Sequence, residues 1–241
     1  MAGDKFIESS YEKALIALFQ ELGYTYECGY DVERDYREPF YREVLEASLK
    51  RLNKGVSADI LAEGLKMVTN LNEGTLIQDN RRFTEMLQNG FAVPYLENGE
   101  NRTATLRLVD FEQPLANDFR IVNQWSVEEL GKIRCDMVVM INGLPLVVVE
   151  LKTASDENVT IEDAYLQIRN YMKKCPSLFG YNAFCVISDL AQSKAGTITS
   201  KFERFMEWKS EDGNYETKLI ADYATFFKGI FMRERLIDIL K

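Results

Sequence analysis

Two acidic residues and a lysine lie at the ends of two apolar segments of this chain. The segment RCDMVVMI contains Asp136, and the segment LPLVVVELK ends with Glu150, Leu151 and Lys152. Charged groups at the ends of buried strands are costly unless something compensates them. Mg²⁺ would do so, because it prefers oxygen ligands and commonly uses one or two carboxylates. We predict a site for phosphodiester hydrolysis in which Asp136, Glu150 and the Leu151 carbonyl bind Mg²⁺, with Mn²⁺ as a substitute.

Lys152 follows Glu150 by two residues, so the two side chains project from the same face of an extended strand. Cleavage of a phosphodiester needs a cation, an activated water and the positioning of both. We predict that Lys152 orients or helps to deprotonate this water, or stabilises the phosphorane. The alternative is a structural ion pair at a strand end, since E-x-K arises about once by chance in a chain of this size. The apolar run 146–149 disfavours that alternative, because it is typical of a strand buried on both faces.

The spacing of the two segments imposes a condition on this site. They are predicted to form a hairpin joined near Asn142 and Gly143. Paired residues in a hairpin share a face, and their numbers add to a constant. A two-residue turn gives an odd sum, which would put Asp136 and Glu150 on opposite faces. We therefore predict an odd-length loop or a β-bulge within residues 142–146.

Hydrophobic periodicity along the chain predicts an α/β fold, with a mixed central sheet flanked by helices. Helices are expected over residues 4–23, 41–52, 57–69, 76–89, 160–174 and 223–241. Strands are expected from about residue 103, over 119–125, in the hairpin 132–151 and over 183–188. Residues 24–39 form a polar, charged segment between the first two helices.

The predicted helix 160–174 carries two polar residues on its inward face. Gln167 and Tyr171 lie one turn apart, on the side that also presents apolar residues to the sheet. Inward polar groups need partners, and a DNA phosphate or the water shell of a metal would serve. The alternative is a core glutamine with protein partners and a tyrosine at the rim.

Two acids of the first predicted helix are further candidates for the metal site. Glu8 and Glu12 lie one turn apart on one helix face, and either can supply an additional carboxylate. A solvated helix face is the alternative explanation for at least one of them.

Composition excludes several kinds of chemistry. The chain has 241 residues, no histidine and four cysteines, none of them in a C-x-x-C pair. Histidine-dependent triads are therefore excluded, and a zinc site with ordinary Cys/His spacing is disfavoured. The net charge of −9 counts against a domain that binds nucleic acid tightly by itself. It does not exclude a nuclease, since acids that hold Mg²⁺ add negative charge and a partner can supply the main grip on DNA.

No apolar run approaches the roughly 20 residues that cross a bilayer. The N-terminal stretch MAGDKFIESS carries acids where a signal peptide has basic and then apolar residues. We therefore expect no membrane association and a cytoplasmic protein.

The sequence resembles a known family at three places, which are Asp136, the run NGLPLVVVELK and the run AYLQIRNY. They are similar to the N-terminal endonuclease domain of the restriction (R) subunit of type I restriction–modification enzymes, within the PD-(D/E)-x-K nuclease superfamily. The resemblance implies Asp136 and Glu150 as metal ligands, Lys152 as the catalytic lysine, and Gln167 and Tyr171 as the adjoining motif. The proline of the superfamily motif is absent, because a cysteine precedes Asp136.

The resemblance also implies a type I site-specific deoxyribonuclease that cuts double-stranded DNA. In that family an ATP-driven translocase follows the nuclease domain, and methyltransferase (modification and specificity) subunits are partners. This chain lacks the G-x-x-x-x-G-K-[ST] motif that binds ATP phosphates, so ATP use is expected of the full-length subunit only. We predict a nuclease domain over 1–225, with a helical insertion over about 40–90 and a catalytic core over about 100–190. Residues 226–241 are predicted to start a linker to a motor domain absent from this chain.

Two alternative functions remain open for this chain. One is a standalone repair or defence nuclease of the same superfamily, which would cut with Mg²⁺ alone. The other is a non-catalytic, nuclease-like module that couples a motor to its partners and fails to bind metal.

Overall fold

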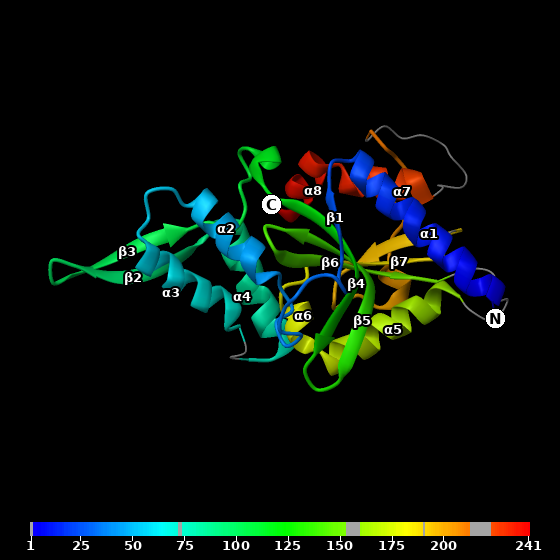
Figure 1. Ribbon diagram of the computed structural model, residues 1–241, viewed down its shortest axis with the longest axis horizontal. Coiled ribbons are helices and arrows are strands. Elements are labelled where there is room, and N and C mark those ends of the chain that lie inside the picture. The colour runs from blue at the N-terminus through cyan, green and yellow to red at the C-terminus, as the bar shows by residue number, and fades with distance from the viewer. Residues whose placement is uncertain (1, 72–73, 153–159, 190, 213–222) are drawn as a thin grey trace.

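A six-stranded mixed sheet forms the centre of the molecule in the computed structural model (Figure 1). The structure describes residues 2–71, 74–152, 160–189, 191–212 and 223–241, with side chains from Ser10 onward. The strands, in spatial order, are β1 (Thr25–Cys28), β4 (Phe119–Glu128), β5 (Lys132–Ile141), β6 (Leu144–Leu151), β7 (Phe184–Ser188) and β8 (Ser193–Gly196). The pairs β1–β4 and β6–β7 are parallel and the others antiparallel, which confirms the predicted mixed sheet.

Helices cover both faces of this sheet (Figure 1). One face packs on α1 (Ala2–Glu21), α7 (Tyr223–Phe231) and α8 (Arg233–Leu240), and the other on α5 (Ile161–Lys174) and α6 (Pro176–Gly180). Each side has its own apolar cluster, because the side chains of β4 and β5 alternate between the two faces. All eight residues of β6 are buried, as the continuous apolar run predicts.

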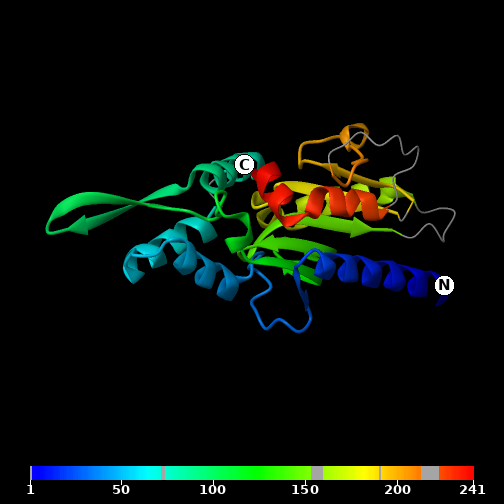
Figure 2. The same cartoon turned by 90° about the horizontal axis from the view of Figure 1, so that it is seen from above.

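A lobe extends from one end of the sheet, as Figures 1 and 2 show from two directions. It contains α2 (Arg42–Leu52), α3 (Ala58–Thr69), α4 (Leu76–Asn89) and a separate hairpin of β2 (Phe91–Glu97) and β3 (Glu100–Leu106). The three helices confirm those predicted over 41–52, 57–69 and 76–89. The prediction missed β2, although Asn98 and Gly99 between two alternating segments are a strong hairpin signal. It also missed β1, which lies in the segment predicted to be polar.

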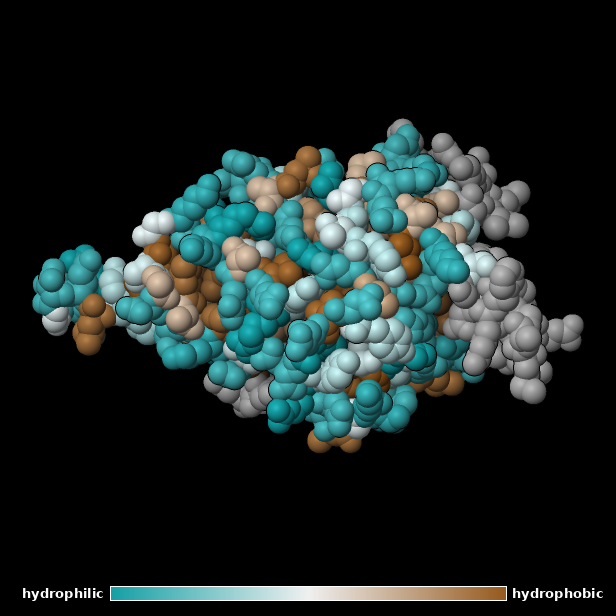
Figure 3. Space-filling view, in the orientation of Figure 1, coloured by the Kyte–Doolittle hydropathy of each residue, from teal (hydrophilic) through white to brown (hydrophobic). Residues whose placement is uncertain are grey.

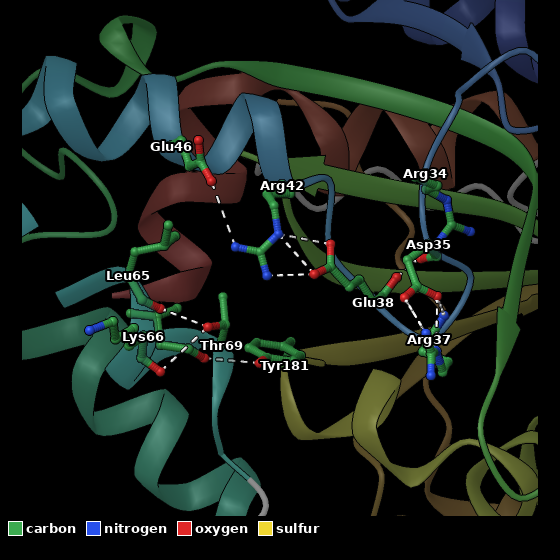
Figure 4. A network of polar contacts seen from close by, with 11 residues as sticks. Arg34, Asp35, Arg37, Glu38, Arg42, Glu46, Leu65, Lys66, Thr69 and Tyr181 are labelled. Atoms are coloured by element: carbon green, nitrogen blue, oxygen red, sulfur yellow. Dashed lines mark hydrogen bonds and ion pairs between the residues drawn. The ribbon is translucent and has the colours of Figure 1, made fainter. Parts of the chain in front are cut away.

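Polar contacts hold the lobe and the connecting segment in place (Figure 4). Arg42, at the start of α2, forms ion pairs with Glu38 and with Glu46. The Tyr181 hydroxyl, next to α6, donates a hydrogen bond of 2.9 Å to the Val68 carbonyl of α3. The Tyr181 bond therefore joins α3 of the lobe to the segment that follows α6.

Apolar surface is exposed on the lobe in the view of Figure 3. A groove between α2 and α3 is lined by Leu49, Val56, Leu61 and Leu65. In the described part of the chain, no helix is both long and apolar enough to cross a membrane.

The predicted helical tail forms two helices separated at Met232, whose backbone is not helical. Several of its apolar side chains are buried in the core cluster, namely Phe226, Phe227, Ile230, Phe231, Leu236, Ile237 and Leu240. The division into a nuclease domain over 1–225 and a linker from residue 226 stays a prediction.

The predicted bulge is present in the β5–β6 hairpin. Ile141 pairs with Leu144, which gives an odd sum, whereas Met137 pairs with Val149, which gives an even sum. The register shifts between these pairs, and the extra residue lies in β6. A two-residue turn and a bulge together therefore produce the even register that the site requires.

Asn142, in the turn of this hairpin, is a fully buried hydrogen-bonding centre. Its Nδ2 donates to the Leu108 carbonyl at 2.9 Å and to Asn117 Oδ1 at 2.8 Å. Its Oδ1 accepts from the Asp118 amide at 2.8 Å and from Arg51 at 2.7 Å. The turn is thereby tied to the chain that precedes β4 and to α2.

Asn142→Ala is expected to lower the free energy of unfolding by about 3 kcal/mol, because it leaves several buried polar groups without partners. Urea unfolding measures this loss. Asn98→Ala is the matched control, since Asn98 also has a positive φ and precedes a glycine, but it is exposed. Equal losses for the two variants would contradict the role given to the Asn142 side chain.

Candidate active site

Asp136, Glu150 and Lys152 lie together at one end of the sheet. Continuing the register of Met137 and Val149 by one residue places Asp136 opposite Glu150. Asp136 Oδ2 accepts a hydrogen bond of 2.8 Å from the Leu151 amide. Lys152 Nζ donates to Glu150 Oε1 at 2.7 Å. The three side chains predicted to form the site therefore converge on one patch, on the face of the sheet that α5 covers.

The negative charge of the Glu150 carboxylate is only partly balanced by positive groups nearby. Its side chain is fully buried, and its Oε2 has no hydrogen-bond partner within the described residues. Burial raises the pKa of Glu150 well above its ordinary value, and the nearby Asp136 carboxylate raises it further. Lys152 acts in the opposite direction and only partly compensates. A buried carboxylate whose charge is only partly compensated is costly.

These donors fit a hard divalent cation. Mg²⁺ is commonly bound by one or two carboxylates, with water and phosphate completing the shell. Asp136 and Glu150 supply two carboxylates, one of which has an oxygen with no partner in the described chain. The described residues contain no cluster of three or more His, Cys, Asp or Glu. The Leu151 carbonyl stays a predicted ligand.

A bend in two strands sets the direction of Asp136. Gln124 of β4 lies opposite Asp136, between the pairs Asn123–Met137 and Trp125–Cys135, and its φ is 54°. Side chains of β5 reverse their alternation here, since Cys135 and Val138 both face the α5 side. No local pattern in the sequence predicts this bend, because glutamine does not favour a positive φ.

Glu12 of α1 contacts β4 at this bend. It accepts hydrogen bonds from the Asn123 side chain and from Gln124 Nε2, the latter at 3.3 Å. Glu12 is thus held by two amides, and its predicted role as an additional metal ligand stays untested. Glu8 is part of α1, but its side chain lies outside the described residues.

Gln167 and Tyr171 lie on the inward side of α5, as predicted. Gln167 Nε2 donates to the Tyr171 hydroxyl at 2.6 Å, and that hydroxyl donates to the Arg134 carbonyl at 2.8 Å. Burial raises the pKa of Tyr171, so the hydroxyl keeps its proton at neutral pH. Tyr171 therefore has protein partners and holds β5 two residues before Asp136. A contact of Gln167 with DNA or with the water shell of a metal stays a prediction.

Two residues near the site were not singled out from the sequence. Tyr11 of α1 and Ser188 at the end of β7 are buried and share a hydrogen bond of 2.6 Å. The Ser188 carbonyl accepts the Lys152 amide at 2.8 Å. No signal in the sequence pointed to them, because a tyrosine on a helix and a serine at a strand end are ordinary residues.

Known proteins resemble this chain over most of its length. Residues 5–204 match the family described as type I restriction enzyme R protein N terminus. The chain belongs to this family. The resemblance predicted from Asp136, Glu150 and their neighbours is therefore confirmed.

Relatives of this R-protein N-terminal chain are named as endonuclease subunits. It is 31% identical over 257 residues to the putative type I restriction enzyme MjaIXP endonuclease subunit of Methanocaldococcus jannaschii, covering 95% of this chain and 25% of that protein. It is 30% identical over 247 residues to the HindI endonuclease subunit of Haemophilus influenzae, covering 97% of this chain and 23% of that protein. The chain thus spans about a quarter of the length of these relatives.

Proposed function

We propose that this R-protein N-terminal chain hydrolyses phosphodiester bonds in double-stranded DNA with Mg²⁺ as its cofactor, on a PD-(D/E)-x-K nuclease core. The supporting observation is the buried Glu150 carboxylate, with one oxygen lacking a partner in the described chain, beside Asp136 and Lys152. In the whole subunit we propose that cleavage is coupled to an ATP-driven translocase. Target recognition belongs to partner methyltransferase and specificity subunits, which agrees with the acidic charge of this chain.

Each residue has a separate part in the proposed reaction. Asp136 and Glu150 hold Mg²⁺, which when bound neutralises charge on the phosphate and makes water more acidic. Lys152 follows the end of β6, with its side chain 17% exposed and its ammonium bonded to Glu150. There it orients the attacking water and stabilises charge on phosphate oxygens. Tyr171 and Gln167 fix the start of β5 behind Asp136.

Thermal unfolding with and without Mn²⁺ tests this proposal through Glu150→Gln. Without metal the variant should unfold at the same Tm as the wild type or at a higher one, because it removes a buried carboxylate whose charge Lys152 only partly compensates. Mn²⁺ should raise the Tm of the wild type and leave that of the variant unchanged, because ligand binding stabilises only a protein that has the site.

Glu27→Gln is the matched control. Glu27 is a strand glutamate that also has a buried oxygen without a partner in the described chain, but it is paired with Arg120. This variant should keep the full response to Mn²⁺. A wild type that does not respond to Mn²⁺ would favour the non-catalytic coupling module. DNA cleavage by the chain with Mg²⁺ alone, without ATP, would favour the standalone nuclease.

A further inference from the structure

One turn of α1 contacts both sides of the candidate active site. Tyr11 and Glu12 are consecutive residues. Each bonds to one of the two strands that flank β5 and β6, the strands of Asp136 and Glu150. Tyr11 reaches Ser188 at the end of β7, next to β6. Glu12 reaches Asn123 and Gln124 in β4, next to β5. Asp136 and Glu150 lie on the two strands between these contacts.

The contact on the β7 side is a buried hydrogen-bond network. Ser188 Oγ bonds the Tyr11 hydroxyl at 2.6 Å and Ser193 Oγ at 2.8 Å. All three side chains are at most 5% exposed. Since the carbonyl of Ser188 accepts the Lys152 amide at 2.8 Å, the network fixes the backbone from which the Lys152 side chain projects.

The contact on the β4 side supports a costly backbone conformation. A positive φ is unfavourable for a residue other than glycine, so its surroundings must hold it in place. Gln124 has such a φ directly opposite Asp136, and Glu12 accepts hydrogen bonds from its side chain and from that of Asn123. Glu12 thereby fixes the bend that directs Asp136.

We propose that Tyr11 and Glu12 act as an α1 clamp, a pair of positioning residues that keeps Asp136, Glu150 and Lys152 in place to bind a divalent cation. The inference rests on the proposed function of this site. A clamp is needed because two neighbouring carboxylates repel each other before the cation binds. Groups that hydrogen-bond a metal ligand directly are typically worth about 10–100-fold in metal affinity. Tyr11 and Glu12 act through one further contact, so we expect the lower end of this range.

Mn²⁺ affinity, measured by calorimetric titration of this chain, tests the clamp. Tyr11→Phe and Glu12→Ala should each weaken binding about tenfold, the lower end of the range for groups behind metal ligands. Glu12→Gln should restore most of the loss, because an amide oxygen still accepts the hydrogen bond from Asn123. This rescue separates a positioning role from direct ligation, in which loss of the carboxylate would itself weaken binding.

Two control variants match these changes away from the site. Tyr24→Phe also removes a buried tyrosine hydroxyl, which donates to the Phe231 carbonyl at 2.9 Å, so its stability loss should be similar. Glu21→Ala removes one negative charge from the exposed end of the same helix, about 13 Å along its axis from Glu12. Both controls should bind Mn²⁺ like the wild type.

The outcomes separate the clamp from the function on which it rests. A wild type that binds no Mn²⁺ would overturn both. A wild type that binds, with Tyr11→Phe and Glu12→Ala indistinguishable from their controls, would overturn the clamp alone. Binding by Glu12→Gln as weak as that of Glu12→Ala would make Glu12 a metal ligand and overturn its positioning role. Should Glu12→Ala fail to fold, Tyr11→Phe against Tyr24→Phe still decides whether the clamp exists.

Discussion

Glu150→Ala is expected to reduce DNA cleavage about a thousandfold in the assembled enzyme, because transition-state charge is no longer stabilised at the site. Glu150 is the most buried of the three candidate residues, and one of its oxygens has no partner in the described chain. Asp136→Ala should have the same effect, since two carboxylates on adjacent strands form the proposed site. Cleavage of a plasmid substrate in the presence of Mg²⁺ and ATP measures the loss.

The control for this experiment is Glu27→Ala, which removes a strand glutamate paired with Arg120 away from the site. It should cut DNA like the wild type, and all variants should keep the ATP hydrolysis expected of the full-length subunit. Cleavage that survives Glu150→Ala would remove this residue from the mechanism. Loss of ATP hydrolysis together with cleavage would indicate a structural defect instead.

Lys152→Ala is expected to reduce cleavage about a hundredfold or more, as loss of a group that positions or activates the nucleophile usually does. Mn²⁺ affinity should be retained or rise, because the variant removes a positive charge that competes with the cation for Glu150. This combination separates Lys152 from the metal ligands, whose loss should abolish binding and cleavage together. Cleavage rates and calorimetric titration on the same preparations provide both measurements.

Lys194→Ala is the matched control for Lys152. Lys194 pairs with Ile187, which in turn pairs with Glu150, so it lies two strands away in the same row of the sheet. Its ammonium lies over the Phe202 ring and not at the candidate site. Cleavage should be largely unchanged in this variant. If Lys152→Ala lost metal binding as well, its role would be to hold Glu150 and not to act on water.

Local patterns in the sequence were enough to predict much of the fold. The helices over the insertion and α5 follow from apolar residues at helical spacing, and β6 from a continuous apolar run. The β-bulge in the β5–β6 hairpin followed from the spacing of the two acids, since Asp136 and Glu150 share a face only if one strand has an extra residue. The hairpin β2–β3 had a local signal at Asn98 and Gly99 that the prediction did not use. The short strand β1 had none, because it is stabilised by pairing with β4.

The sequence by itself determined the family, the α/β class and the three residues of the candidate site, because these depend on residue types at short spacing. Tertiary structure alone decided how those residues are held. The reversal of side-chain direction at Asp136 depends on Gln124 in a neighbouring strand. The contacts of Tyr11 and Glu12 join residues more than one hundred positions apart. Such contacts exist only once the chain is folded, since no periodic pattern of the sequence encodes a bond between distant side chains.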